Sequence, residues 1–537
     1  MARYIGRRDL LRLLGGGALG LASGGAARLL AGCSEPTGDM AQIAPESTPV
    51  PVGADVDLDL LLRAEPGEAQ ILPGRPTPVW RYRAEVLSGD PQAVAAVPDS
   101  YLGPTIRVSQ GQRIRVRLQN HVSEPTIIHW HGLLVPPDMD GHPRDAIGPG
   151  SEYVYTFDVP NRAGTYWYHP HTHMLTGPQV YRGLAGLFLV SDAEEAALRL
   201  PSGAYDVPLV IQDRTFNRDN TLVYVGSGMM DRMVGFLGER VLVNGQADYA
   251  FTVVRRPYRL RLLNGSNSRI YKLAWEDGTP LTVIGTDAGL LEAPVERRYV
   301  TLGPAERVEL WVDFGRWPRG KRVRLVSLPF WETSTGVGMG SSTGPANGSA
   351  FTLLTAQIDL ETDEGAVLPG RLVSMLRHDE RDSVNVNDPR RWRLLMGGGG
   401  MGMNWTINGR LFEMEAVARD EVVRLGTQET WVYDNTASAG GGMGMMGTMM
   451  QLAHPMHVHA THMQVVERTV LPDSEVDYAS LSEGYVDEGW KDTVLVMPGE
   501  RVRLVLRFEA HDGFFMHHCH NLEHEDMGMM RNFRIDP

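Results

Sequence analysis

A short run near the end of the chain, residues 517–529, reads HHCHNLEHEDMGM and combines one thiol, four imidazoles and thioethers. Thiolate, imidazole and thioether together are the ligands of a blue copper site. Cys519, His524 and Met529 follow one another at intervals of five residues. His518 and His520 flank the thiol, and strand alternation sends both to the face opposite Cys519. The run therefore predicts a copper site whose flanking imidazoles bind further metal ions.

Four histidine pairs of the form His-x-His occur in the chain. Alternation along a strand puts both members of a pair on one face, where they can reach two neighbouring metals. A single pair could equally be a surface pair, but four in one chain indicate ligands. None of the 17 histidines lies between His173 and His378, so the middle of the chain cannot supply imidazole ligands. Besides the pair around Cys519, the pairs are His129 with His131, His169 with His171, and His457 with His459, the last preceded by His454.

Two strand patterns occur three times in the same order, which predicts three related domains. Both show the period-2 alternation of half-buried strands around glycine turns. Few long helical stretches, with 60 Gly and 34 Pro spread between short strands, favour all-β sandwiches. We expect three consecutive domains over residues 56–195, 196–365 and 366–537. The first pattern covers 102–120, 251–264 and 415–435, and the second covers 148–157, 303–312 and 498–506.

Length and charge narrow the class of protein. A chain of 537 residues with 42% hydrophobic residues is too long for a single compact core. Its net charge of −14 argues against a nucleic-acid partner.

The first 33 residues read as an export signal. Arg7-Arg8 forms a twin-arginine pattern before a moderately apolar stretch, which is typical of the route for folded proteins. The stretch ends Leu-Ala-Gly-Cys33, which resembles a lipoprotein cleavage box; an ordinary signal peptide is the alternative. Arg12 and Arg28 interrupt the apolar run, short of the roughly 20 residues that a membrane span needs. We expect a periplasmic or cell-surface protein, with residues 34–55 as a flexible tether to a lipid anchor.

Cysteine usage predicts no disulfide, even though an exported protein could form one. Cys33 and Cys519 are the only two cysteines, one in the leader and one in the candidate metal site. The mature protein should therefore contain no internal disulfide.

The four histidine motifs, in this order and with these spacings, resemble those of the multicopper oxidases, a family of three Greek-key cupredoxin domains. The resemblance covers nearly all of the mature chain and implies four copper ions. By position, the type 1 copper would be bound by His454, Cys519 and His524, with Met529 as axial ligand. The type 2 copper would be bound by His129 and His457, one type 3 copper by His131, His169 and His520, and the other by His171, His459 and His518.

The resemblance also implies a reaction. A substrate gives single electrons to the type 1 copper, Cys519 passes them through His518 and His520 to a trinuclear cluster between the first and third domains, and four electrons reduce dioxygen to two waters. Because four protons are consumed, acids are expected near the cluster.

Asp140 and Glu525 match positions where family members keep proton-donating carboxylates; the alternatives are a turn-forming Asp and a solvated Glu. Asp492 is either a residue that orients a ligand or a plain turn residue. His173, His462 and His517 fall outside the coordination pattern.

Methionines are the remaining clue to the substrate. Two Met/Gly-rich segments, 396–403 and 440–450, occur in the third domain. Thioethers prefer Cu(I), so the second segment predicts a docking site for cuprous ions, as in the copper-efflux oxidases that the chain also resembles. Alternatively, these methionines are adaptable filler around an organic-substrate pocket. The candidate thioether ligands are Met443, Met445, Met446, Met449 and Met450.

No carboxylate precedes His454 at 449–453, where the efflux enzymes carry one that helps to hold substrate copper. We therefore expect laccase-like oxidation of phenols or aromatic amines as the main activity and cuprous oxidation as the alternative. A copper-free scaffold or a simple electron carrier would lack ligands, and none is missing. We expect a monomer that uses dioxygen.

Overall fold

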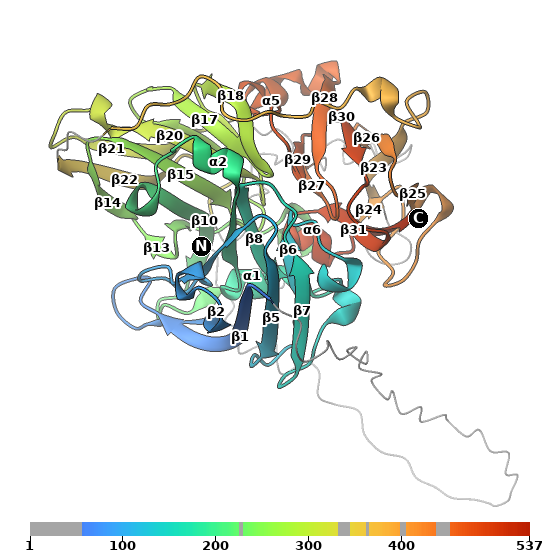
Figure 1. Cartoon of the computed structure of the whole chain (residues 1–537), viewed down its shortest axis with the longest axis horizontal. Helices are drawn as coiled ribbons and strands as arrows, with labels where there is room; N and C mark the ends of the chain where they lie inside the picture. Colours follow the sequence, from blue (N-terminus) through green and yellow to red (C-terminus); the bar gives the residue numbers. More distant parts are fainter. Residues whose placement is uncertain (1–55, 225–228, 331–343, 361–364, 398–403, 437–451) are drawn as a thin grey trace, which may run out of the picture. The chain divides into compact units, whose positions relative to one another are not determined.

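The computed structural model describes residues 56–224, 229–330, 344–360, 365–397, 404–436 and 452–537 (Figure 1). The predicted leader with Cys33, the tether 34–55 and the candidate residues Met443, Met445, Met446, Met449 and Met450 lie outside the described residues. β-Strands are the main regular secondary structure of the described residues, and they are arranged in pairs of sheets. The prediction of an all-β protein is confirmed.

The first sandwich, residues 58–191, packs a four-stranded sheet against a five-stranded sheet. Side chains of both sheets, such as Ile114, Trp130 and Phe188, meet in one buried core. The β5 segment alternates exposed or half-buried with buried positions, as predicted for a strand with one face on a core. In sheet order the strands are β2 (Thr77–Ser88), β1 (Leu58–Ala69), β5 (Arg113–Asn120) and β7 (Glu152–Asp158), then β3 (Val94–Ala95), β4 (Thr105–Ser109), β9 (Gly186–Ser191), β8 (Gly164–Pro170) and β6 (Ile128–His131).

The middle sandwich, residues 206–360, has the largest apolar core of the three. One sheet contains β13 (Gln246–Ala247), β12 (Arg240–Val243), β10 (Asp206–Phe216), β15 (Pro257–Asn264), β20 (Arg307–Asp313), β17 (Leu281–Thr286) and β18 (Gly289–Arg297), with β11 (Leu222–Val223) beside β10. The other contains β14 (Ala250–Val254), β22 (Phe351–Leu360), β21 (Arg322–Ser327), β16 (Tyr271–Trp275) and β19 (Val300–Leu302).

The third sandwich, residues 390–536, repeats the arrangement around a core that includes Trp431, Phe515 and Cys519. One sheet contains β24 (Asn404–Ile407), β23 (Arg390–Gly397), β26 (Gln428–Asp434), β30 (Glu500–Arg507) and β28 (Met463–Val470). The other contains β25 (Val422–Arg424), β32 (Met530–Asp536), β31 (Gly513–Cys519), β27 (His454–Val458) and β29 (Thr493–Val496).

The three sandwiches share their strand pairing. In each, the two sequence patterns form neighbouring antiparallel strands: β5 with β7, β15 with β20, and β26 with β30. In each, the same central strand also pairs in parallel with an earlier strand, namely β1, β10 or β23. The predicted domain limits at 195 and 365 fall between sheets but remain predictions.

The α-helices of the described residues are few and short. They are α1 (Thr176–Arg182), α2 (Ala193–Ala197), α3 (Met229–Val234), α5 (Glu475–Ala479) and α6 (Leu522–Asp526). Three of them gather at one place, because α6 of the third sandwich contacts both α1 and α3. Within the described ranges, no helix has the length and apolar character needed to cross a membrane.

Candidate metal centre

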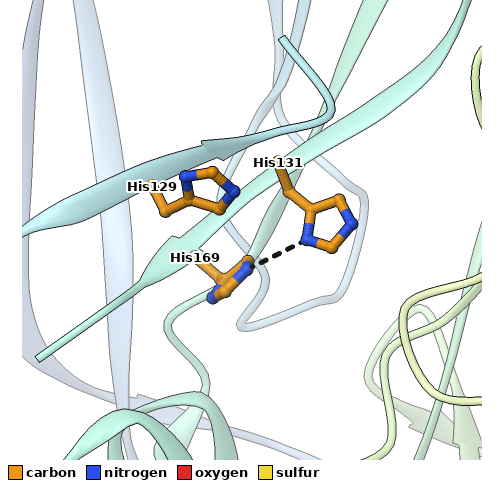
Figure 2. A group of neighbouring side chains, drawn as sticks. All are labelled: His129, His131 and His169. Atoms are coloured by element: carbon orange, nitrogen blue, oxygen red, sulfur yellow. Dashed lines mark hydrogen bonds between the residues drawn. The ribbon is translucent and has the colours of Figure 1, made fainter. Parts of the chain in front are cut away.

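The histidine pairs lie on, or directly at the ends of, two pairs of neighbouring strands. In the first sandwich, β6 and β8 place His129 opposite His169. In the third sandwich, β27 and β31 place His457 opposite His518. Alternation turns Trp130, between the two histidines of β6, into the core of the first sandwich. The intervening residues thus anchor the strands while the histidines share one face (Figure 2).

Eight imidazoles from the two sandwiches converge. All eight are at most 1% exposed. Across the interface, Nε2 of His129 lies 3.3 Å from Nε2 of His457, and Nε2 of His171 lies 3.2 Å from that of His518. The remaining short contacts are His459 Nε2 to His518 Nε2 at 3.1 Å, and His169 Nε2 to His131 Nδ1 and to His520 Nε2, both at 3.4 Å.

In each ring we call the nitrogen that faces the other imidazoles the inner nitrogen, and the one that faces away the outer nitrogen. The contacts of the outer nitrogens show which nitrogen carries the proton. A carbonyl oxygen only accepts, so a ring nitrogen beside one must donate. The inner nitrogens of the same rings then carry lone pairs that face one another, an arrangement that a cation between them would stabilise. The outer contacts are His129 Nδ1 to Asp140 O, His457 Nδ1 to Asp492 O and His169 Nδ1 to Pro170 O, each 2.8 Å, and His518 Nδ1 to Cys519 O, 3.0 Å.

Burial keeps the imidazoles in their neutral, metal-binding form. It lowers the pKa of His131, His169, His171 and His457 well below the ordinary value of histidine. The pKa of His459 falls to about 3, chiefly through burial. The donor set therefore fits copper in both atom type and charge state.

Two predicted acids lie beside these rings. Asp140 is 2% exposed; its Oδ2 accepts from His459 Nδ1 at 2.6 Å, and its Oδ1 lies 3.3 Å from His129 Nδ1. Glu525 is fully buried, with Oε2 3.2 Å from His518 Nδ1 and Oε1 3.8 Å from His171 Nε2. Neither Glu525 oxygen accepts a hydrogen bond from the described residues. Both acids thus reach pairs of ligand candidates, and Glu525 keeps its acceptor capacity free.

A second, three-residue group lies in the third sandwich. His454 Nδ1 and His524 Nδ1 lie 3.5 and 3.7 Å from Cys519 Sγ and 3.2 Å from each other. His454 begins β27, Cys519 ends β31, and His524 lies on α6, whose first turn is capped by Asn521 accepting from the His524 amide. Met529 is buried in the same core, and its carbonyl accepts from the Cys519 amide at 3.1 Å.

Trp405 and Met233 enclose this group, and no motif in the sequence indicated either residue. The Trp405 ring lies 4.7 Å from the His454 ring and 4.8 Å from the His524 ring. The Met233 carbonyl, on α3 of the middle sandwich, accepts from His524 Nε2 at 2.8 Å and from Trp405 Nε1 at 3.0 Å. His454 Nε2 has no partner among the described residues. The outer nitrogen of His524 is therefore hydrogen-bonded, whereas that of His454 is not.

The other histidines lie outside the converging rings. His462 Nε2 donates to the Gly132 carbonyl at 2.8 Å, and His517 is buried against Trp392 and Tyr433. His173 packs on Phe412.

Comparison with known proteins agrees with this geometry. Two family models, each described as multicopper oxidase, match residues 79–195 and 384–537. A laccase of Bacillus stratosphericus is 30% identical over 86% of this chain and 91% of its own. The structure of the McoA multicopper oxidase of Aquifex aeolicus superposes with a TM-score of 0.72 at 31% identity, over 90% of this chain and 97% of that one. A Campylobacter jejuni multicopper oxidase described as a metallo-oxidase gives a TM-score of 0.69 at 26% identity, over 89% and 91%.

The chain belongs to the multicopper oxidase family. It is a copper-dependent oxidoreductase of cupredoxin fold that couples oxidation of a reducing substrate to reduction of dioxygen.

The buried imidazoles make stability depend on pH in the copper-free protein. Their folded pKa lies below the unfolded value near 6.5, so their stabilisation is present above about pH 6.5 and is lost as pH falls. Each such histidine should lower the free energy of unfolding by about 1.4 kcal/mol per pH unit.

We expect the copper-free protein to lose stability between pH 7.5 and 5.5, measured by calorimetry. His517 is buried with a lowered pKa, so His517→Phe should reduce the slope, whereas the exposed His121→Phe should leave it unchanged. A flat profile over this range would contradict the assignment of neutral buried rings.

Proposed function

We propose that the eight converging histidines and the three-residue group of His454, Cys519 and His524 together hold four copper ions. The ions would have the arrangement that the family pattern implies. His454, Cys519 and His524 would bind type 1 copper, with Met529 as axial ligand. The eight converging histidines would bind one type 2 and two type 3 ions, with His129 and His457 on the type 2 ion. The facing lone pairs of six of these rings, 3.1 to 3.4 Å apart, carry this proposal, because neither nitrogen of such a pair has a proton to donate to the other. Bound copper would supply the redox chemistry, in which four single electrons from the substrate reduce dioxygen to two waters.

Cys519 would connect the two groups. Its thiol belongs to the three-residue group, while its chain neighbours His518 and His520 belong to the eight-histidine group. Burial raises the pKa of the Cys519 thiol well above its ordinary value, so the thiol gives up its proton only when a metal takes its place.

Replacing Cys519 by Ser tests whether Cys519 connects the three-residue group to the eight histidines. The variant should lose the blue thiolate-to-copper absorption and turnover, and its copper content should fall from about four to about three ions per chain, because the eight histidines remain. His517→Gln, two positions earlier on β31, should keep colour, copper and turnover. Substantial turnover by C519S would disprove the connecting role, and wild-type protein that binds well under four copper ions would disprove the ligand assignment.

Asp140 and Glu525 would supply protons to the reduction of dioxygen. Each carboxylate is buried and lies against ring nitrogens of two ligand candidates. Although burial raises the pKa of Asp140, the neighbouring His459 and His129 hold it below the ordinary value of aspartate, so Asp140 would pass protons on as a carboxylate rather than store one.

Asp140→Asn should lower turnover about 10²-fold or more while leaving copper content and the blue absorption unchanged, since positioned acids contribute about 10² to 10⁴. Asp138, two residues earlier, is exposed, and Asp138→Asn should have no effect. Steady-state oxygen uptake with copper analysis of both variants makes the comparison. Unchanged turnover in D140N would exclude Asp140 as the proton donor.

The substrate would be a phenol or aromatic amine, as the similarity to a laccase suggests. A cuprous ion is the second candidate, supported by the similarity to a metallo-oxidase and by the methionines that precede His454. The outer nitrogen of His454 has no partner among the described residues, so electrons would enter on the His454 side of the three-residue group.

Replacing Met443, Met445, Met446, Met449 and Met450 together by Leu separates the two candidates. For a laccase-like enzyme, turnover of phenols and of Cu(I) should fall little, because Leu preserves apolar volume. Selective loss of Cu(I) turnover would instead identify a cuprous oxidase. The matched control is Met174→Leu, at an exposed methionine outside both metal groups.

The chain would act as a monomer after export by the twin-arginine route, in the periplasm or at the cell surface, anchored by lipid on Cys33.

A further inference from the structure

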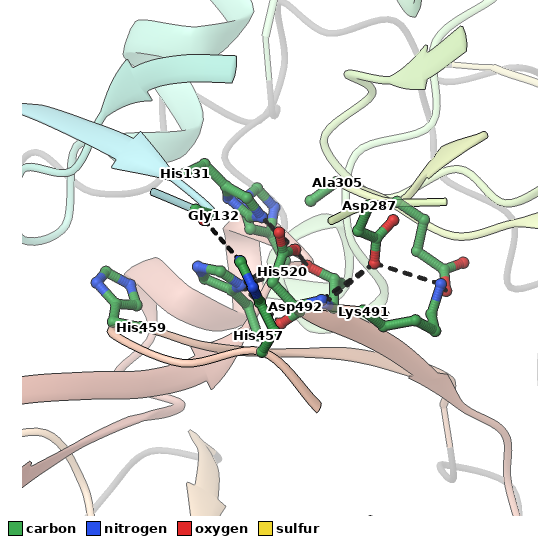
Figure 3. A network of polar contacts seen from close by, with 12 residues as sticks. His131, Gly132, Asp287, Ala305, His457, His459, Lys491, Asp492 and His520 are labelled. Atoms are coloured by element: carbon green, nitrogen blue, oxygen red, sulfur yellow. Dashed lines mark hydrogen bonds and ion pairs between the residues drawn. The ribbon is translucent and has the colours of Figure 1, made fainter. Parts of the chain in front are cut away.

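The middle sandwich, which the sequence shows to be free of histidine, reaches the metal centre through Arg307. This residue begins β20 and is 1% exposed. All five guanidinium N–H groups have acceptors, and two of them donate to the two carboxylate oxygens of Asp492 of the third sandwich, like a fork. Figure 3 shows Asp492 with Asp287 and Lys491 beside it. The contacts are Nη1 to Asp492 Oδ1 at 2.7 Å, Nη2 to Asp492 Oδ2 at 2.5 Å, Nη1 to Ala305 O at 3.0 Å, Nη2 to Asp287 O at 2.8 Å and Nε to Thr165 O at 2.9 Å.

Asp492, held in place by Arg307, in turn accepts hydrogen bonds from two histidines. Its Oδ1 accepts from His131 Nε2 at 3.0 Å, and its main-chain carbonyl accepts from His457 Nδ1 at 2.8 Å. Thr493 reinforces the position by donating from Oγ1 to Asp492 Oδ1 at 2.9 Å. Asp492 is fully buried, so the ion pair with Arg307 is screened little by solvent.

His131 is the ring for which this matters most. His129, His169, His457 and His518 hold their outer Nδ1 against carbonyl oxygens and turn Nε2 inwards. His131 is reversed: its Nδ1 lies 3.4 Å from His169 Nε2, and its Nε2 faces Asp492. A carboxylate at Nε2 fixes the proton there and leaves the Nδ1 lone pair for a metal. The reversed ring therefore depends on where Asp492 is held.

Gly132 packs closely against the contact between Arg307 and Asp492. A side chain on Gly132 would put its Cβ 2.4 Å from Asp492 Oδ2 and 3.0 Å from Arg307 Nη2, and Gly132 adopts a φ of +86°. Only glycine fits both the conformation and the close approach.

A second layer from the middle sandwich supports the fork. Asp287 Oδ1 accepts from the Arg307 amide at 2.8 Å, and Asp287 Oδ2 accepts from the Asp492 and Thr493 amides, both at 3.3 Å. Lys491 Nζ lies 3.3 Å from Asp287 Oδ2 and 3.0 Å from Glu306 Oε1. These charges are buried and mutually paired, so loss of one leaves another uncompensated.

We propose that Arg307 is a positioning residue of the metal centre, which holds the Asp492 carboxylate against His131 so that this ring presents Nδ1 to the metal. The middle sandwich thus contributes to metal binding without supplying a ligand. The inference rests on the proposed function, because it assigns a role toward the copper ions that the eight histidines would hold.

Arg307→Lys tests the role, since lysine keeps the charge but cannot form the two-pronged contact. We expect a 10- to 100-fold weaker affinity for the copper ions of the eight-histidine group, the range seen when partners of metal ligands are removed. The blue absorption of the three-residue group should persist. The type 2 signal in electron paramagnetic resonance should change or vanish, because Asp492 also holds His457, a candidate ligand of the type 2 ion. Copper affinity would be measured by equilibrium dialysis.

Arg261→Lys is the matched control. Arg261 is also a buried arginine of the middle sandwich, paired with Asp206 and Glu309 and bonded to Thr165 of the first sandwich at 3.1 Å. It contacts none of the eight histidines in the described structure. R261K should lower the melting temperature of the copper-free protein yet leave copper affinity and the type 2 signal unchanged.

Asp492→Asn, with nearly the same shape, keeps the test decisive if R307K does not fold. It should reproduce the loss of copper affinity, because an amide can present a donor to His131 Nε2. Wild-type affinity and an unaltered type 2 signal in R307K or in D492N, or an equal loss in R261K, would overturn the proposal. Failure of the proposed function itself would appear already in the wild type, as absence of copper binding.

Discussion

The structure depends on keeping unprotonated nitrogen atoms from separate rings within 3.1 to 3.4 Å of one another. Neutral imidazoles do not attract each other through two lone pairs, so something else must hold them. Main-chain carbonyls and buried carboxylates do so from outside, each fixing the proton on the outer nitrogen. Those acceptors in turn belong to strands that are anchored in two separate hydrophobic cores. The three-sandwich architecture is thus the frame that keeps an unfavourable arrangement of lone pairs ready for cations.

Much of this could be predicted from the sequence because strand alternation has only two faces. The His-x-His pairs had to share a face, and the residue between them had to point into a core, as Trp130 does. Repeated strand patterns likewise predicted the antiparallel pairs that recur in each sandwich. Asp140 and Glu525 were found by family resemblance, and their contacts with two rings each depend on how the first and third sandwiches meet.

The contributions of the middle sandwich could not be predicted. Arg307 follows a Gly-Pro turn in a repeat without histidine, and arginine on a strand has no local signature of contact with a metal site. Its role depends on tertiary placement, because Asp492 lies 185 residues further along the chain. The short helix α6 could not be predicted from strand periodicity either. Its only start signal is the Asn521 side chain, which lies within a segment made mostly of potential metal ligands. What the sequence could supply was the identity of candidate ligands, whereas their supports came from distant residues.

The contacts of the Met233 carbonyl affect what a comparison of homologous sequences can show about the surroundings of His524. It accepts from both Trp405 and His524, so one main-chain oxygen of the middle sandwich limits access to one imidazole. Every amino acid carries that oxygen, and the contact therefore places no restriction on which residue occupies position 233. Two homologues with different residues there can share the same electrostatic surroundings of this histidine, and two with identical residues can differ if α3 shifts. A comparison of the residues at this position therefore cannot show whether the hydrogen bond to His524 is present. That bond depends on the path of the backbone.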